Sequence, residues 1–153
     1  MTQSVGPQIE TPPQPIPDED SAGFWKATRE GHLEICRCQG CRRWLQPPLE
    51  RCPRCWAETA FESVSGGGEV HSFIVVHQPA IPGYRDKLPY VVALVTLDEQ
   101  AGLRLPGRIV GIETSDARVG QRVQAELEDL PGGDYKVAVF RPDPTARILR
   151  RSD

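Results

Sequence analysis

The sequence predicts a mainly β protein with an N-terminal helix, a rubredoxin-like zinc ribbon and a five-stranded OB-fold barrel. Two observations lead to this fold class. Between Cys38 and Cys55, two Cys-x2-Cys pairs flank ten residues, a spacing typical of a site that binds one metal ion through four thiolates. After residue 68, five short β-branched or apolar segments alternate with turns rich in Gly, Pro and Asp. Such strands close readily into a small barrel, because closure removes exposed sheet edges.

The composition fits one ordinary domain or two very small ones. The chain has 153 residues, of which 39% are hydrophobic, and its 15 prolines and 14 glycines mark tails and turns. A net charge of −3 argues against a general nucleic-acid-binding protein, which presents a basic face. Residues 1–20 lack the apolar segment of a secretory signal, and no apolar run approaches the roughly 20 residues that span a bilayer. We expect a cytoplasmic protein outside the membrane.

The two ends of the chain are predicted to be tails. Residues 1–17 hold five prolines among polar residues, a composition that buries too little apolar area to offset the entropy of the chain. This segment is therefore predicted to be disordered. Residues 142–153 are predicted to form a flexible C-terminal tail.

Residues 18–31 are predicted to form a short helix. Acidic residues stand at its start, where the helix dipole favours them, Ser21 is a candidate N-cap, and Gly31 is expected to end the helix. Phe24 and Trp25 are two large aromatic residues on this helix, so a surface must cover them. That surface is either the protein's own core or a partner's.

Residues 32–64 are predicted to form the ribbon. The four metal ligands are expected to be Cys38, Cys41, Cys52 and Cys55. Four cysteines close the coordination shell and leave no position for a catalytic water, so the expected Zn²⁺ is structural. Metal binding then supplies much of the folding free energy of the ribbon, because so short a segment cannot bury a core of its own.

Two alternatives to a zinc site remain. The cysteines could form two disulfides, although a reducing compartment favours metal-binding thiolates. The metal could be iron, because Cys52-Pro53-Arg54-Cys55 looks like half of a rubredoxin site. Such loops usually carry Gly after the second cysteine, a position that favours positive φ, whereas this chain has Arg42 and Trp56 there. Zinc is the preferred interpretation.

Five arginines are predicted to make the ribbon the one basic patch of an acidic chain, against a single acid, Glu50. They are Arg37, Arg42, Arg43, Arg51 and Arg54. They can balance the net charge of −2 on Zn²⁺ with four thiolates, or they can bind phosphate, whose oxygens match the guanidinium fork. The first interpretation is preferred. A fifth thiol, Cys36, is expected to be a strand residue that could replace a lost ligand.

Residues 65–141 are predicted to form the barrel. Ser65-Gly66-Gly67-Gly68 is expected to be a flexible joint in front of it. The five strands are expected over residues 70–76, 90–97, 107–112, 122–127 and 135–140. Residues 78–89 contain three prolines and cannot continue a strand. We expect a long loop there, and such loops more often bind than pack.

The sequence shows no catalytic constellation. The three histidines, His32, His71 and His77, have no acid or nucleophile at a spacing that implies a triad or a metal pair. The chain has no serine in a nucleophile elbow and no P-loop lysine. We therefore expect no catalytic residue in this chain, and apart from the metal ligands its cofactor-binding residues are unknown.

The order of motifs along the chain resembles the pattern of a known family. It runs from Phe24-Trp25 through the cysteine pairs to Pro89-Tyr90-Val91-Val92-Ala93-Leu94-Val95 and Gly120-x-x-Val123. Over about residues 20–141 the pattern is similar to the zinc-ribbon/OB-fold family of small acyl-CoA-associated proteins, domain of unknown function 35. Arg42 and Trp56 depart from it, because the family commonly has Gly after each cysteine pair, and Cys36 is an additional cysteine.

The resemblance implies a non-catalytic subunit that forms a hetero-oligomer with a thiolase-like protein. On this view the partner holds the catalytic residues and acts on C–C bonds of acyl-CoA. A degradative thiolase is the preferred partner, and acyltransferases, aldolases and hydratases are the others that the family implies. The subunit would keep its partner stable and active, and a coenzyme A thioester could lie at their interface.

A single-stranded nucleic-acid-binding module is the alternative function. It would need aromatic platforms on strands beside a basic groove. The barrel offers Phe73, Tyr90, Tyr135 and Phe140, but its acidic residues outnumber its basic ones. We therefore expect no nucleic acid among the partners.

Overall fold

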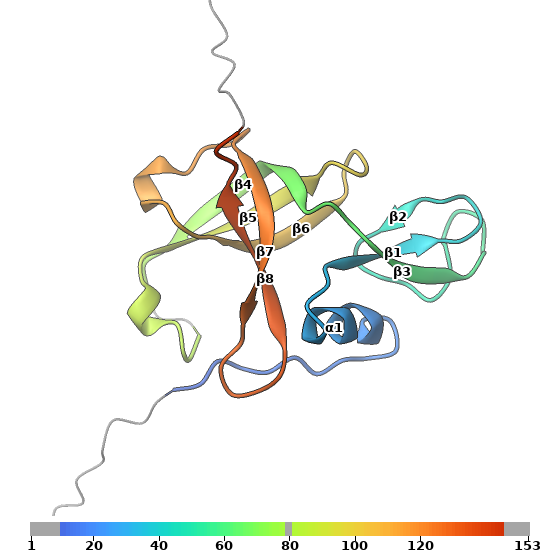
Figure 1. The fold of residues 1–153 in the computed structure, drawn as a ribbon, viewed down its shortest axis with the longest axis horizontal. Helices are drawn as coiled ribbons and strands as arrows, with labels where there is room; N and C mark the ends of the chain where they lie inside the picture. The colour runs from blue at the N-terminus through green and yellow to red at the C-terminus, as the bar shows by residue number, and fades with distance from the viewer. Residues whose placement is uncertain (1–9, 79–80, 146–153) are drawn as a thin grey trace, which may run out of the picture.

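The computed structural model describes residues 10–78 and 81–145. The elements within them are α1 (Ala22–Arg29), β1 (Glu34–Cys38), β2 (Trp44–Leu45), β3 (Thr59–Ser63), β4 (Gly67–Val76), the 3-10 helix η1 (Arg85–Lys87), β5 (Tyr90–Leu97), β6 (Arg104–Ile109), the 3-10 helix η2 (Thr114–Asp116), β7 (Arg122–Asp129) and β8 (Lys136–Pro142). Strands β1 to β3 form a small sheet, and β4 to β8 form a closed barrel. Figure 1 shows the two side by side, with α1 next to the small sheet. The predicted mainly β fold class is confirmed.

The helix α1 is shorter than the predicted segment 18–31. A turn precedes it, in which the Asp18 carboxylate accepts a hydrogen bond from Ser21 N–H at 2.8 Å. The Ser21 side chain makes no capping bond to the helix, because its hydroxyl donates to Asp18 instead. Ser21 therefore occupies the predicted N-cap position, but its side chain does not cap the helix. Gly31 follows the helix at φ 87°, a left-handed conformation that favours glycine and ends helices.

The aromatic residues of α1 face the protein's own strands. Phe24 packs against the main hydrophobic core. The Trp25 ring meets the Tyr135 ring edge-on, with centroids 5.8 Å apart. Gly23 lets the helix approach β3 closely, because a Cβ atom there would lie 2.2 Å from the Phe61 ring. Of the two surfaces considered for these aromatic residues, the structure shows the internal one.

The small sheet and the barrel share one core. Ile35 from β1 and Trp44 from β2 belong to the same buried cluster as barrel residues such as Val95 and Phe140. Gln100, which follows β5, accepts a hydrogen bond from Trp44 N–H at 2.9 Å and donates one to Trp44 O at 3.2 Å. The ribbon is therefore fixed to the barrel by packing and by a reciprocal pair of hydrogen bonds.

The barrel has the strand order β4-β5-β6-β8-β7 and closes between β7 and β4. Strands β6 and β8 are parallel, and the other neighbouring pairs are antiparallel. This is the five-stranded architecture that the sequence predicted. The predicted strand 90–97 coincides with β5, whereas β6 begins and ends three residues before the predicted segment 107–112. Strand β8 continues one residue into the predicted C-terminal tail.

The predicted flexible joint is wrong, because Gly67 and Gly68 belong to strand β4. Gly68 pairs with Leu97 on β5 and with Val123 on β7, where the barrel closes. A Cβ atom at Gly68 would lie 2.6 Å from the Thr96 carbonyl oxygen. Glycine is therefore required here so that three backbones can converge, and the segment is part of the rigid barrel.

Residues 10–17, which we call the N-terminal arm, lack regular secondary structure but contact the barrel. Pro12 is buried, and the Gln14 side chain donates to Pro131 O at 2.9 Å in the β7–β8 turn. In Figure 1 the arm passes along this turn on its way to α1. The arm therefore differs from the predicted disordered tail, because its prolines fit against the folded barrel. Residues 1–9 and 146–153 of the predicted tails lie outside the described residues.

An ion pair lies where the barrel closes between β7 and β4. Arg122 on β7 donates to both oxygens of Asp98, at 2.7 and 2.6 Å, and these bonds lower the pKa of Asp98 below its ordinary value. A carboxylate whose pKa is lowered on folding stabilises the protein above its unfolded pKa, and the stabilisation is lost as the pH falls through the folded pKa.

Asp98→Asn is therefore expected to lower the free energy of unfolding at pH 7. The cost is less than about 1 kcal/mol, because the pair is partly exposed. The difference between wild type and variant should shrink below about pH 4, near the ordinary pKa of Asp. Urea unfolding of wild type and variant at each pH measures this difference in the free energy of unfolding. Titration of other groups affects both proteins alike and cancels in the difference. A difference that is constant between pH 7 and pH 3 would contradict this prediction.

Candidate metal centre

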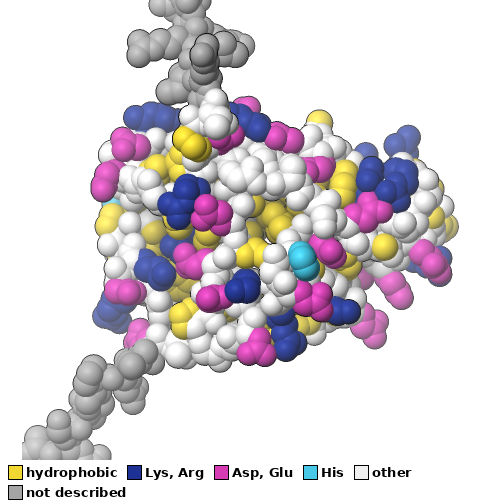
Figure 2. Space-filling view, viewed as in Figure 1, with side chains coloured by type: hydrophobic (Ala, Val, Ile, Leu, Met, Phe, Trp, Pro, Cys, Tyr) yellow, Lys and Arg dark blue, Asp and Glu magenta, His cyan; other side chains and the backbone are white. Residues whose placement is uncertain are grey.

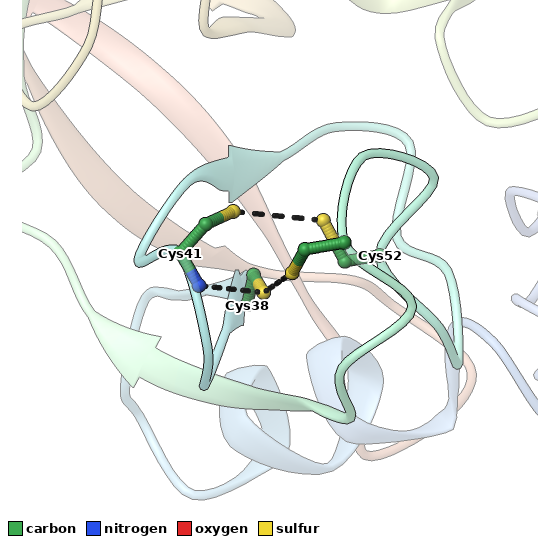
Figure 3. A group of neighbouring side chains, drawn as sticks. Cys38, Cys41 and Cys52 are labelled. Atoms are coloured by element: carbon green, nitrogen blue, oxygen red, sulfur yellow. Dashed lines mark hydrogen bonds between the residues drawn. The ribbon is translucent and has the colours of Figure 1, made fainter.

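The four predicted cysteines come together between two loops. Their Sγ atoms all lie within 4.8 Å of one another. The Cys38 and Cys55 Sγ atoms are 3.4 Å apart, and those of Cys41 and Cys52 are 3.7 Å apart. Figure 3 shows Cys38, Cys41 and Cys52 turned toward a common centre. A tetrahedron of sulfurs at about 2.3 Å from zinc has edges of about 3.8 Å, so this donor set fits one Zn²⁺.

The disulfide alternative does not fit these distances. All five cysteines are free, and the shortest of the separations above, 3.4 Å, far exceeds the S–S bond length of about 2.0 Å. Cys38 and Cys52 are buried, whereas Cys41 and Cys55 are exposed. Each Cys-x2-Cys pair thus offers one thiol from inside the ribbon and one from its surface.

The backbone of the first loop stabilises a thiolate. The N–H groups of Gly40 and Cys41 both donate to the Cys38 Sγ at 3.3 Å. Burial raises the pKa of Cys38, but these donors and the neighbouring Cys55 thiol outweigh it and lower the pKa to about 6. The two N–H donors therefore favour the thiolate form of Cys38, which is the form that binds metal.

The two loops have the same shape, although neither has the expected glycine. Cys38 N–H donates to Arg43 O at 2.8 Å, and Cys52 N–H donates to Ala57 O at 3.0 Å, so each loop closes in the same way. The residue after the second cysteine is left-handed in both, with φ 62° at Arg42 and 63° at Trp56. The position thus adopts positive φ in both loops, and a large residue takes the conformation for which such loops usually carry glycine.

Trp56→Gly is expected to stabilise the metal-loaded protein. A left-handed conformation costs a non-glycine residue roughly 1–2 kcal/mol, and the greater freedom of glycine in the unfolded chain offsets about 0.5–1 kcal/mol of that gain. The Trp56 side chain is 76% exposed, so little packing is lost. Thermal melts should therefore show a small rise in Tm.

Trp56→Ala is the matched control, because it removes the ring and keeps the unfavourable backbone. Its Tm should stay close to that of the wild type or fall slightly. If the glycine variant melts below the alanine variant, backbone strain at this position does not limit stability.

Three of the five ribbon arginines form ion pairs with acidic residues. Arg42 donates to both carboxylate oxygens of Glu62, at 2.7 and 2.8 Å, and Arg37 contacts the same carboxylate at 3.0 Å. These two arginines lower the pKa of Glu62. Arg51 pairs with Glu58 at 3.4 Å. The prediction of a patch with Glu50 as its only acid is therefore wrong, because Glu58 and, on β3, Glu62 also lie beside the arginines. Figure 2 shows basic and acidic side chains intermixed at the ribbon end.

The other candidate residues lie apart from the cysteine cluster. Cys36 is buried on β1, and its thiol lies 3.5 Å from Leu49 O, so it serves as the predicted strand residue. His32, His71 and His77 are all exposed. Tyr84 and Lys87 belong to the long loop for which the sequence favours binding, and the Tyr84 ring lies near Lys87 and Arg108. Only the long-range folding of the loop onto the barrel reveals this cluster.

Comparison with known proteins agrees with this architecture. Residues 25–62 match the family model "ChsH2, rubredoxin-like zinc ribbon domain", and residues 62–128 match "ChsH2, C-terminal OB-fold domain". Ribbon and barrel together therefore define the chain as a protein of the zinc-ribbon/OB-fold class. A "DUF35 domain-containing scaffold protein" of Methanocaldococcus jannaschii is 36% identical over 104 residues, which cover 66% of this chain and 72% of that protein. The chain belongs to the DUF35 family, and the predicted resemblance is confirmed.

Two further relatives are components of enzymes. A "Probable enoyl-CoA hydratase alpha subunit" of Thermomonospora curvata is 36% identical over 132 residues, which cover 85% of this chain. The chain spans only 40% of the length of that protein. In the solved structure of the "Ltp2-ChsH2(DUF35) aldolase", one chain is 33% identical and superimposes with a TM-score of 0.76, covering 84% of this chain and 98% of that one. Among the described residues, no helix has the length and apolar character needed to cross a membrane.

Proposed function

We propose that this chain is a non-catalytic, zinc-binding subunit of a thiolase-superfamily complex that acts on C–C bonds of acyl-CoA. The observation that carries the proposal is the similarity to the aldolase component. Ribbon and barrel superimpose together on a chain that is solved in complex with a second protein, and 98% of that chain is covered. The name of the archaeal relative, a scaffold protein, supports the same role.

The proposed ligands of one structural Zn²⁺ are the four clustered cysteines, Cys38, Cys41, Cys52 and Cys55. The distances between their Sγ atoms support tetrahedral coordination. Four thiolates leave no coordination site for substrate or water. The metal would therefore hold the two loops together and take no part in chemistry. Because the ribbon shares its core with the barrel, metal binding would also stabilise the remainder of the subunit.

Catalysis is proposed to lie on the partner. Within this class, the name of the aldolase relative favours an aldolase that cleaves a C–C bond over the degradative thiolase preferred from the sequence. The name of the hydratase relative adds a hydratase, which does not act on a C–C bond, as the alternative partner. The hydratase relative is named for a coenzyme A thioester, enoyl-CoA, so the proposal retains a coenzyme A thioester at the interface. Cytoplasmic localisation is part of the same proposal.

Co-expression with candidate partners tests the role. The full chain would be produced together with thiolase-like and hydratase-like proteins encoded in the same genome, and each pair purified by a tag on this chain. Acyl-CoA thiolysis, retro-aldol cleavage and hydration would be assayed with each protein alone and with the pair. We expect co-purification and activity only in the pair. Partners that are fully active alone and elute separately would overturn the proposal.

The nucleic-acid alternative receives less support from the fold. Two of its four candidate platform residues are buried, since Phe140 is fully enclosed and Tyr90 is 9% exposed. Buried rings cannot stack on bases. A mobility-shift assay with single-stranded DNA and RNA would detect such binding directly.

A further inference from the structure

A cavity of about 620 Å³ lies between the barrel, α1 and the N-terminal arm. Residues of β5, β6 and β8 form its floor, including Val92 and Val137. Phe24 and Trp25 from α1 form one wall, and prolines of the arm form another. This volume falls in the range of roughly 300–1,000 Å³ that is usual for small-molecule sites. The cavity thus lies where separate segments meet, and none of the four clustered cysteines lines it.

The lining of this cavity is apolar apart from a few groups. Its polar side chains include those of Gln14, Gln46 and Tyr84, and Arg108 is the one charged residue that lines it in the described part of the chain. An apolar enclosure with few polar groups is typical of sites that bind an apolar molecule and orient it by one polar end. Arg108 marks that end.

The charges around Arg108 leave an excess of positive charge. The Arg108 side chain is 13% exposed, and its guanidinium pairs with Glu128. The same carboxylate also accepts Lys87, whose Nζ lies 3.5 Å away. The Tyr84 ring lies near both cations, with Arg108 Cζ 5.5 Å and Lys87 Nζ 5.9 Å from its centroid. One carboxylate therefore balances only one of two cations, and an anionic group would complete the cluster.

We propose that this cavity binds an apolar monocarboxylate. Its apolar body would lie between the aromatic residues of α1 and the barrel, and its carboxylate would contact Arg108, which lines the cavity. Lys87, which shares Glu128 with Arg108, adds positive charge beside it. Burial of the apolar body supplies most of the binding free energy, and the cations select the head group. This inference goes beyond the proposed function, because binding is a property of the isolated subunit and needs no catalytic partner.

Calorimetric titration of the zinc-loaded full chain tests the proposal with three probes of equal chain length: decanoate, decan-1-ol and decylamine. We expect saturable binding of decanoate at least tenfold tighter than that of the alcohol or the amine. Arg108→Gln should remove this preference. Equal affinity for the three probes would overturn the role of the cations, and absence of decanoate binding would overturn the site.

Two variants locate the binding independently of charge. Val92→Trp places a large side chain in the cavity and leaves Arg108, Lys87 and Glu128 in place, so it should abolish decanoate binding. Leu94→Trp is the matched control, because Leu94 lies two residues further along β5, is 39% exposed and does not line the cavity. Unchanged binding by the Val92 variant, with its zinc content and melting temperature intact, would overturn the location.

Discussion

Cys52→Ser is expected to abolish stoichiometric zinc binding and unfold the ribbon. Cys52 is fully buried, so its thiolate cannot be replaced by solvent without opening the loop. Structural zinc sites contribute apparent free energies of about 10–16 kcal/mol in small zinc domains, which is comparable to the usual stability of a whole domain, about 5–15 kcal/mol. Because Ile35 and Trp44 of the ribbon are part of the barrel core, the barrel should also melt at lower temperature.

Cys36→Ser is the matched control for this experiment. Cys36 is also a buried ribbon cysteine, but it lies outside the cluster of four, and its Sγ is 3.5 Å from Leu49 O. A serine hydroxyl can donate to the same carbonyl. We expect one zinc per chain in the control and much less in Cys52→Ser, measured by elemental analysis after gel filtration. Equal zinc content and equal Tm in the two variants would contradict the four-cysteine site.

The cysteine cluster could be predicted because its determinants are local. Two residues between cysteines fix the shape of each loop, and chemistry fixes what four thiolates bind. Strand β5 was also predictable, since the apolar run from Tyr90 to Leu97 covers its whole length. Strand β6 was placed three residues too late, because Pro106 and two arginines interrupt its apolar pattern.

Features that depend on contacts between distant segments could not be predicted. Three consecutive glycines have the composition of a flexible joint, and only the Thr96 carbonyl, 2.6 Å from a Cβ atom at Gly68, explains why they belong to a strand. The arm was predicted to be disordered because proline-rich segments bury little of their own surface, yet Pro12 is buried against the folded protein. The ion pairs of Arg42 and Arg51 likewise depend on how β3 lies beside the loops.

Phe140→Ala is expected to destabilise the barrel by about 3–5 kcal/mol, the usual cost of truncating a buried phenylalanine. Phe140 is fully buried and pairs with Ile109 on one side and Ala125 on the other. Gly107 lies directly over its ring, because a Cβ atom there would be 2.8 Å from it, so no neighbouring side chain can fill the space. The expected fall in Tm is roughly 6–20 °C for a chain of this size.

Ile74→Ala is the control, because Ile74 is a barrel residue that is 63% exposed; its change should stay within about 0.5 kcal/mol. Phe140→Ala should retain one zinc per chain at low temperature, since Phe140 lies in the barrel and the four thiols stay in place. Comparison with Cys52→Ser then separates two sources of stability, the metal and the barrel core. If Phe140→Ala loses zinc as readily as Cys52→Ser, the shared core at Ile35 and Trp44 makes ribbon and barrel a single cooperative unit.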